Sequence, residues 1–353
     1  TMDLVSQKSN VICIIGMHRS GTSMIARLLN LYGLDLGPEE KLLGPNASNA
    51  LGHFEHTDFL KIDDELLEHF GGSWDNPPDL EPGWQHDSSL EKFVHEAKSL
   101  VSTFSESNTW GWKEPRTTIL LPFWGSLLPN LRFVICLRSP VEVARSLVGR
   151  DGISIEKSFY LWNHYMRAAI RDTEGYPRIF TFYEDYFRDA STEIERLVDF
   201  CGLPKQDDLS QVQAAIVQDL RHHTSETLEL LEETNVATEY KLLYICLRAV
   251  SFREFVPTGS KDGVSENISK FLQLIDKFHN QDKMSQLETA LAERDQELSK
   301  LQSRMKKREQ QIQEQMAQLQ EHTARLQAFS DQVRQSLAYR FYRKFIKPFS
   351  RAE

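Results

Sequence analysis

The segment VICIIGMHRSGTSMIARLLN, residues 11–30, constrains the fold more than any other part of the sequence. Apolar residues typical of a buried strand lead into a glycine turn, and apolar residues at helical spacing follow. Gly16 and Gly21 have the spacing of the phosphate-binding motif G-x-x-x-x-G-K-[ST]. A strand, a glycine turn and a helix N-terminus present backbone N–H groups to an anion, so the segment predicts an anion site in an α/β fold.

The positive charge of this loop is displaced from its usual place. Thr22 stands where the motif has lysine, and Arg19 supplies a charge before the second glycine. In nucleotide-hydrolysing loops the lysine reaches the β and γ phosphates while a hydroxyl holds Mg²⁺. The sequence shows no convincing strand-end acidic partner for that metal. The loop therefore disfavours a divergent P-loop kinase or NTPase, which stays the alternative enzyme class.

Composition narrows the classes further. The chain has 353 residues, 40% of them hydrophobic, which is enough for one large domain and additional segments. Its net charge of −10 argues against a general nucleic-acid binder. No leader is recognisable and no apolar run reaches ~18 residues, so we expect a cytoplasmic protein. The scattered cysteines predict reduced thiols rather than disulfides or a metal site.

Strand and helix patterns alternate through residues 1–256, which predicts a domain with a parallel sheet flanked by helices, as in P-loop NTPases. Buried strands are expected at 11–15, 131–138 and 178–184. Helical spacing of apolar residues occurs at 22–33, 58–70, 89–106 and 154–173, and Ser139-Pro140 opens another helix.

The composition changes after a polar linker at 257–283. Residues 284–335 lack proline and glycine and predict a long helix that self-associates as a coiled coil, making the protein a homo-oligomer. A lone solvated helix, or one that packs on the first domain, is the alternative. The apolar residues that recur every seven positions are Met284, Leu291, Leu298, Met305, Ile312, Leu319, Leu326 and Val333.

The tail at 336–353 mixes basic and aromatic residues. Its cations and apolar side chains suit the interface of an anionic bilayer, which predicts peripheral contact with the inner face of the membrane. Docking on a partner enzyme or on the chain's own first domain is the alternative. The basic residues are Arg340, Arg343, Lys344, Lys347 and Arg351.

Three motifs in this sequence resemble those of sulfotransferases, in the family's order. HRSGTS resembles the 5′-phosphosulfate loop, in which a Lys or Arg precedes S-G-T. LRSPVEVARSL places Arg138 and Ser146 as in the strand and helix that bind the donor's 3′-phosphate. GWKEPR, residues 111–116, resembles the K-[DE]-P segment of the tyrosylprotein and related carbohydrate branches. The resemblance covers roughly residues 10 to 225.

This resemblance implies the sulfotransferase fold and transfer of a sulfo group from 3′-phosphoadenosine 5′-phosphosulfate (PAPS) to an acceptor hydroxyl. It implies that Lys113 lies near the scissile S–O bond. No metal is expected, because fixed cations and amides can stabilise transfer of a group that carries less charge than phosphoryl. The donor-binding residues implied are Arg19, Ser20, Gly21, Thr22, Ser23, Arg138 and Ser146, and Arg19 is also expected to act in catalysis.

A general base must take the acceptor's proton. NALGHFEHTDF, residues 49–59, resembles a segment of bacterial sulfotransferases, and we select Glu55 in it. His53 is the first rival, and Glu39 or Glu40 comes next.

The acceptor suggested by the resemblance is a bacterial surface glycan or its lipid-linked precursor. Trp74, in the loop-like segment GGSWDNPP, is a candidate platform for stacking a sugar ring. A small phenolic acceptor is an alternative, as is a coiled-coil scaffold with an inert nucleotide domain. Arg221 is a weaker candidate for closing over the 3′-phosphate.

Overall fold

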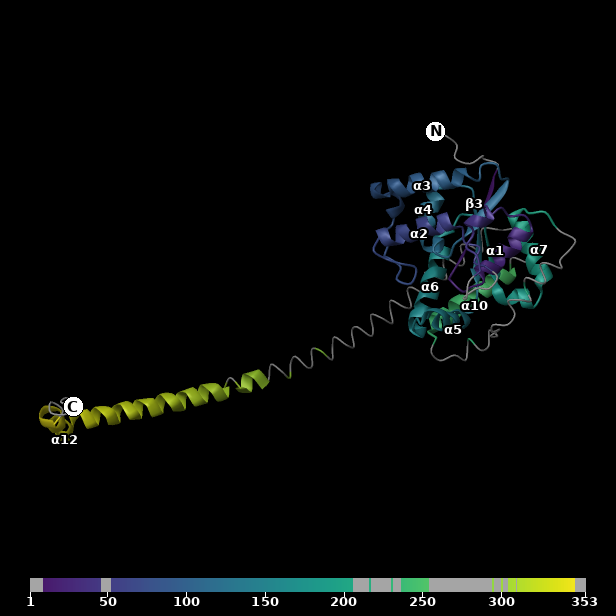
Figure 1. Cartoon of the computed structure of the whole chain (residues 1–353). Coiled ribbons are helices and arrows are strands. Elements are labelled where there is room, and N and C mark those ends of the chain that lie inside the picture. Colours follow the sequence, from purple (N-terminus) through teal and green to yellow (C-terminus); the bar gives the residue numbers. More distant parts are fainter. Residues whose placement is uncertain are drawn as a thin grey trace. The chain divides into compact units, whose positions relative to one another are not determined.

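The computed structural model describes residues 9–45, 52–205, 236–253 and 310–346, together with 304–308 and a few single positions. The chain forms two compact units, Thr1–Ile275 and Asp276–Glu353 (Figure 1). The boundary predicted at 256/257 and the linker at 257–283 lie outside the described residues.

The first unit is built on a parallel four-stranded sheet in the order β2-β1-β3-β4. Ile14 in the central strand β1 lies opposite Lys113 on one neighbour and Val134 on the other. Because all strands run in parallel, their carboxyl ends meet at one edge, where the loops that carry the predicted donor residues begin. The strands are β1 (Asn10–Gly16), β2 (Thr109–Lys113), β3 (Leu131–Leu137) and β4 (Arg178–Phe182).

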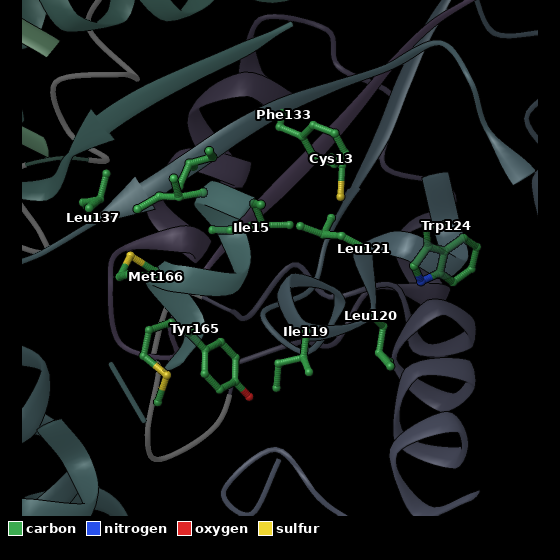
Figure 2. Close-up of a cluster of buried hydrophobic side chains, with 14 of the residues drawn as sticks. Cys13, Ile15, Ile119, Leu120, Leu121, Trp124, Phe133, Leu137, Tyr165 and Met166 are labelled. Carbon is green, nitrogen blue, oxygen red and sulfur yellow. The ribbon is translucent and has the colours of Figure 1, made fainter. Parts of the chain in front are cut away.

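Helices cover both faces of this sheet, which confirms the predicted fold class. Alternate residues of β1 point to opposite faces, so Cys13 and Ile15 join one apolar cluster and Ile12 and Ile14 the other. The first cluster, part of which Figure 2 shows around Cys13 and Ile15, is covered by α2 to α6 and α10, and the second by α1 and α7. The helices are α1 (Thr22–Leu31), α2 (Thr57–His69), α3 (Glu91–Ser102), α4 (Thr117–Leu127), α5 (Pro140–Asp151), α6 (Ile155–Asp172), α7 (Ala190–Cys201) and α10 (Thr238–Arg253).

The elements differ from the sequence prediction in a few places. The strand predicted at 178–184 ends at Phe182, because Tyr183–Phe187 form the 3₁₀ helix η4. Shorter 3₁₀ turns occupy Glu39–Lys41 (η1), Trp84–His86 (η2) and Ser88–Leu90 (η3). The helices α4, α7 and α10 were not predicted. In α4 the residues are buried nearly all round and leave no amphipathic period.

The second unit contains a helix over 310–335, followed by α12 (Leu337–Phe341) and the π-helical turn η5 (Tyr342–Ile346). The heptad residues of the described stretch form an exposed row, so the stripe that would make a coiled-coil seam is present. Self-association through it stays a prediction. The exposed row consists of Met305, Ile312, Leu319, Leu326 and Val333.

Across the described residues, no helix combines the length and the apolar character that crossing a bilayer requires.

Some predicted features fall on positions that the structure does not describe. The predictions that lie outside the described residues concern Arg221, Met284, Leu291, Leu298, Lys347 and Arg351.

Candidate active site

The loop between β1 and α1 is tightly packed at both of its glycines. Gly16 and Gly21 have φ angles of 145° and 85°. A Cβ at Gly16 would collide with the carbonyl oxygen of Cys136, and one at Gly21 with the ring of Tyr183. Arg19 also has a positive φ of 69°. Only glycine fits the two outer positions, and the intervening residues are held in a compact turn in front of α1.

The N-terminus of α1 is suited to an anion. Gly21, the N-cap residue of α1, provides no side-chain hydrogen bond to the helix, and the first turn of α1 holds no acidic residue. The N–H groups of a first helical turn lack intrahelical acceptors, and the helix dipole favours negative charge there. This end of α1 can therefore receive a phosphate or sulfate group.

Buried polar atoms without protein partners lie in and beside this loop. Within the described residues, His18 Nε2, Ser20 Oγ and Ser139 Oγ are buried and make no hydrogen bond to protein. Ser139 is the N-cap residue of α5. Buried polar atoms are nearly always hydrogen-bonded, so these three atoms fit a polar ligand.

The two predicted donor motifs meet at Arg19. Its Nε donates to the hydroxyl of Ser146, 127 positions away, at 2.8 Å. Arg138 Nη1 in turn donates to the backbone oxygen of Arg19 at 3.3 Å. The structure thus brings Arg19, Arg138 and Ser146 together at the carboxyl edge of the sheet.

Arg138 is held by several neighbours. Its Nη2 lies 3.3 Å from Glu142 Oε2, and its guanidinium lies 4.5 Å from the centre of the Tyr183 ring. The backbone oxygen of Arg138 accepts the indole N–H of Trp162 at 3.1 Å. Glu142 also pairs with Arg145 at 3.3 Å. The sequence pattern did not single out Glu142, because an acidic residue in a first helical turn usually compensates the helix dipole.

Lys113 lies at the end of β2 with a fully buried amino group. Its Nζ forms a short ion pair with Glu55 Oε1 and lies 3.3 Å from the hydroxyl of Ser23 in the first turn of α1. Lys113 therefore contacts two other residues that the sequence assigned to transfer and donor binding, although all three come from distant segments. Glu55 Oε2 accepts no hydrogen bond from the described residues.

The rivals of Glu55 are placed differently. His53 Nδ1 lies 3.8 Å from Glu55 Oε2, and partial burial lowers the pKa of His53 while the Glu55 charge opposes that shift. Glu39 and Glu40 are exposed on η1. Among the described residues, neither of them is joined to Lys113 by a hydrogen bond or ion pair. Of the rivals, only His53 adjoins the Lys113–Glu55 pair.

His56, also considered in the sequence, has a structural place. Its Nδ1 accepts the N–H of Asp58 at 3.3 Å and caps α2, and its ring packs against Phe59 and Phe104. Nowhere in the ranges that the structure describes do three or more His, Cys, Asp or Glu side chains gather as a metal site would require.

Glu114, the residue after Lys113, has a role that the sequence did not predict. Its buried Oε1 accepts the backbone N–H of Arg116 at 3.0 Å and pairs with the Arg116 side chain at 2.8 Å. Burial is the main cause that raises the pKa of Glu114. Arg116 also pairs with Asp64 on α2 at 2.5 Å. These contacts tie the end of β2 to α2, the helix that follows Glu55.

Trp74 lies between α2 and α3 and is partly buried. Its ring is 4.5 Å from the ring of His18 and 5.7 Å from the guanidinium of Arg150. Its backbone oxygen accepts the hydroxyl of Tyr165 at 2.8 Å. The tryptophan that the sequence favoured for stacking thus adjoins the loop between β1 and α1.

A family model described as "Sulfotransferase family" matches residues 11–208. Among solved structures, the sulfotransferase STF1 of Mycobacterium tuberculosis is similar at 13% identity and a TM-score of 0.39, over 64% of this chain and 76% of that one. The sulfotransferase domain of the Synechococcus olefin synthase shows 15% identity and a TM-score of 0.35, over 76% and 97%. Mouse sulfotransferase SULT7A1, complexed with PAP, shows 11% identity and a TM-score of 0.35, over 76% of this chain and 90% of that one. No curated protein sequence matches this one.

Proposed function

The chain belongs to the sulfotransferase family, and from that premise we propose that it transfers a sulfo group from PAPS to a hydroxyl group of an acceptor, without a metal ion. The observation that carries this proposal is the position of Lys113, whose amino group touches Glu55 on one side and Ser23, at the anion-binding end of α1, on the other. A cation and a carboxylate thus meet beside a phosphate-type loop.

The donor fits the groups around the loop. The first-turn N–H groups of α1, Ser20 and Ser23 would hold the 5′-phosphosulfate, and Arg138 and Ser146 the 3′-phosphate. The buried atoms Ser20 Oγ and Ser139 Oγ, which make no hydrogen bond within the described chain, support a polar occupant here. Mouse SULT7A1 was crystallised with PAP, the form of the donor without its sulfo group, which also supports the assignment.

In the proposed reaction, the acceptor oxygen bonds to sulfur while the bond between sulfur and the 5′-phosphate oxygen breaks. Glu55 takes the acceptor's proton, and PAP leaves with the bonding electron pair. Lys113 and Arg19 stabilise the negative charge that grows on the leaving oxygen and on the transferred group. A buried site strengthens such interactions relative to water.

For the acceptor we propose a sugar hydroxyl of a bacterial surface glycan or of its lipid-linked precursor. Trp74 supports this choice, since a partly buried indole beside the loop, with Arg150 near its ring, offers a surface for stacking a sugar.

The exposed heptad row supports a homo-oligomer. The basic tail supports peripheral contact of a cytoplasmic enzyme with the membrane or with a partner enzyme.

The experiment that tests the function is turnover of PAPS labelled in its sulfo group, with parallel panels of glycans, phenols and peptides. Transfer of label to glycans, and its loss in Trp74→Ala while PAP still binds, is the expected result. Transfer to small phenols alone would replace the glycan with the alternative acceptor class. If no label is transferred to any panel and PAP does not bind, the remaining interpretation is a coiled-coil scaffold with an inert nucleotide domain.

A further inference from the structure

A buried set of charges connects α10 to the strand end that carries Arg138. Arg248 on α10 is 7% exposed, and its Nη1 contacts both carboxylate oxygens of Asp185 at 2.5 and 2.6 Å. Its Nη2 lies 3.3 Å from Glu184 Oε2. The guanidinium also lies 4.2 Å from the centre of the Phe182 ring. One arginine of α10 therefore holds both acidic residues of η4.

The same short helix touches the donor side. Glu184 Oε1 accepts the backbone N–H of Ser139 at 2.8 Å, at the residue that directly follows Arg138. Tyr183, the neighbour of Glu184, lies under the Arg138 guanidinium and leaves no room for a Cβ at Gly21. A displacement of η4 would therefore move both Arg138 and the wall of the loop.

We propose that Arg248 is a positioning residue for the 3′-phosphate of the donor, acting through Glu184 and Ser139 on the side chain of Arg138. This inference rests on the proposed function, since it takes Arg138 as the 3′-phosphate ligand. The family model matches residues 11–208. The donor site then depends on a helix beyond the matched segment.

Loss of the Arg248 charge should have a large effect on Glu184 and Asp185. Glu184 is buried, and its burial raises its pKa, while the Ser139 N–H and the Arg248 charge act in the opposite direction. Removing Arg248 would leave Glu184 and Asp185 without their main cation in a poorly solvated place. Either a proton would be taken up or η4 would shift toward solvent. In both cases the acceptor of the Ser139 N–H is weakened.

The test compares Arg248→Met with Arg196→Met. Arg196, on α7, is a matched control because it also pairs with a glutamate, Glu193, at 2.7 Å and bonds a strand oxygen, that of Phe180, at 2.8 Å. Calorimetric dissociation constants for PAP and for AMP are measured for each variant. We expect Arg248→Met to lower the preference for PAP over AMP by about tenfold or more, the scale of a lost charged hydrogen bond. Arg196→Met should lower the thermal midpoint and leave the preference unchanged.

The outcomes separate the two claims. A wild-type protein that binds PAP and AMP equally would overturn the proposed function itself. A wild-type preference for PAP that persists in Arg248→Met would overturn only the role of Arg248. Should Arg248→Met not fold, Arg248→Lys decides: a Lys keeps one of the two ion pairs, so the preference should fall severalfold, and an unchanged preference would count against the inference.

Discussion

The amino group of Lys113 and the carboxylate of Glu55 form a buried ion pair, with side chains that are 0% and 8% exposed. Removing one partner leaves the other charge buried and uncompensated, which typically costs about 3–5 kcal/mol. Substitution of either residue alone should therefore lower stability as well as turnover. The turnover of variants at these positions must therefore be compared at an equal folded fraction.

Donor recognition should not depend on a metal. Because Arg138 and Ser146 are proposed to hold a 3′-phosphate, the protein should bind PAP far more tightly than AMP or ATP, and EDTA should not change this. Arg138→Met should bring PAP affinity close to that of AMP. Titration calorimetry measures all of these constants. Equal affinity for ATP, or binding that disappears with EDTA, would contradict the assignment.

Glu55→Gln and Lys113→Met should each lower turnover about 10²-fold or more, the scale of a lost general base or transition-state charge partner. PAP affinity should stay near the wild-type value in Glu55→Gln and fall in Lys113→Met, because PAP carries on its 5′-phosphate the charge that Lys113 is proposed to stabilise. Glu40→Gln is the control, because Glu40 is exposed on η1, and it should retain turnover. Near-normal turnover of Glu55→Gln would move the base to His53 or to Glu39 or Glu40.

At Gly21, the effect of the tight packing can be measured separately from the cost of the left-handed backbone by comparison with Gly33. Gly21 and Gly33 have φ angles of 85° and 92°, but only at Gly21 would a Cβ meet another side chain, the ring of Tyr183. Alanine at either position should cost roughly 1–3 kcal/mol of stability for the left-handed backbone. Gly21→Ala alone should also weaken PAP binding. Equal PAP affinity in the two variants would show that the loop tolerates a side chain.

Asp63 gives a pH dependence of stability. It is buried on α2, accepts the indole N–H of Trp124 at 2.8 Å and a hydrogen bond from Thr117, and burial raises its pKa to about 8. The folded state thus favours the protonated carboxyl, so this contribution to stability is complete below the unfolded pKa of about 4 and is lost as pH rises through about 8. Asp63→Asn should remove this loss. Chemical denaturation of both proteins from pH 5 to 9 measures it, and parallel curves would contradict the assignment.

The exposed heptad row predicts self-association. Replacing Leu319 and Leu326 together by glutamate should convert the oligomer to a monomer, because charge in an apolar seam prevents helix pairing. Glutamate at the neighbouring Gln320 and Gln327 is the control with the same change in charge. Sedimentation equilibrium distinguishes the species. A wild-type monomer at all concentrations would leave the solvated helix as the description of 310–335.

The sequence motifs pointed to the candidate donor-binding residues but not to the buried charged residues that hold them in place. Arg19, Arg138 and Ser146 could be singled out because they stand in motifs that resemble those of sulfotransferases, and the structure joins them by hydrogen bonds. Glu184 and Arg248 could not, since a Y-E-D segment and an arginine in a helix look like ordinary surface charges until the fold buries them together. Glu142 and Glu114 were missed for the same reason, because burial depends on neighbours that are distant in sequence.

The helix pattern was less informative where burial is complete. Most residues of α4 are buried and leave no polar face, so its 3.6-residue period does not appear in the sequence. The amphipathic helices α2 and α6 were recognised within one or two residues of their observed ends. An amphipathic period arises only where one face of a helix is buried and the other is exposed. A helix that is buried on all faces therefore shows no such period in its sequence.

The strand order has a consequence for synthesis of the chain. β1 is made first but occupies the interior of the sheet, between β2 and β3. Until residues 109–113 have left the ribosome, the apolar segment Asn10–Gly16 has no neighbouring strand on either edge, and its second edge stays unpaired until residues 131–137 follow. An unpaired apolar strand readily joins another chain. Shorter nascent chains therefore expose an unpaired apolar strand edge, and the loop between β1 and α1 cannot take its final form before Cys136 and Tyr183, which pack on Gly16 and Gly21, have been made.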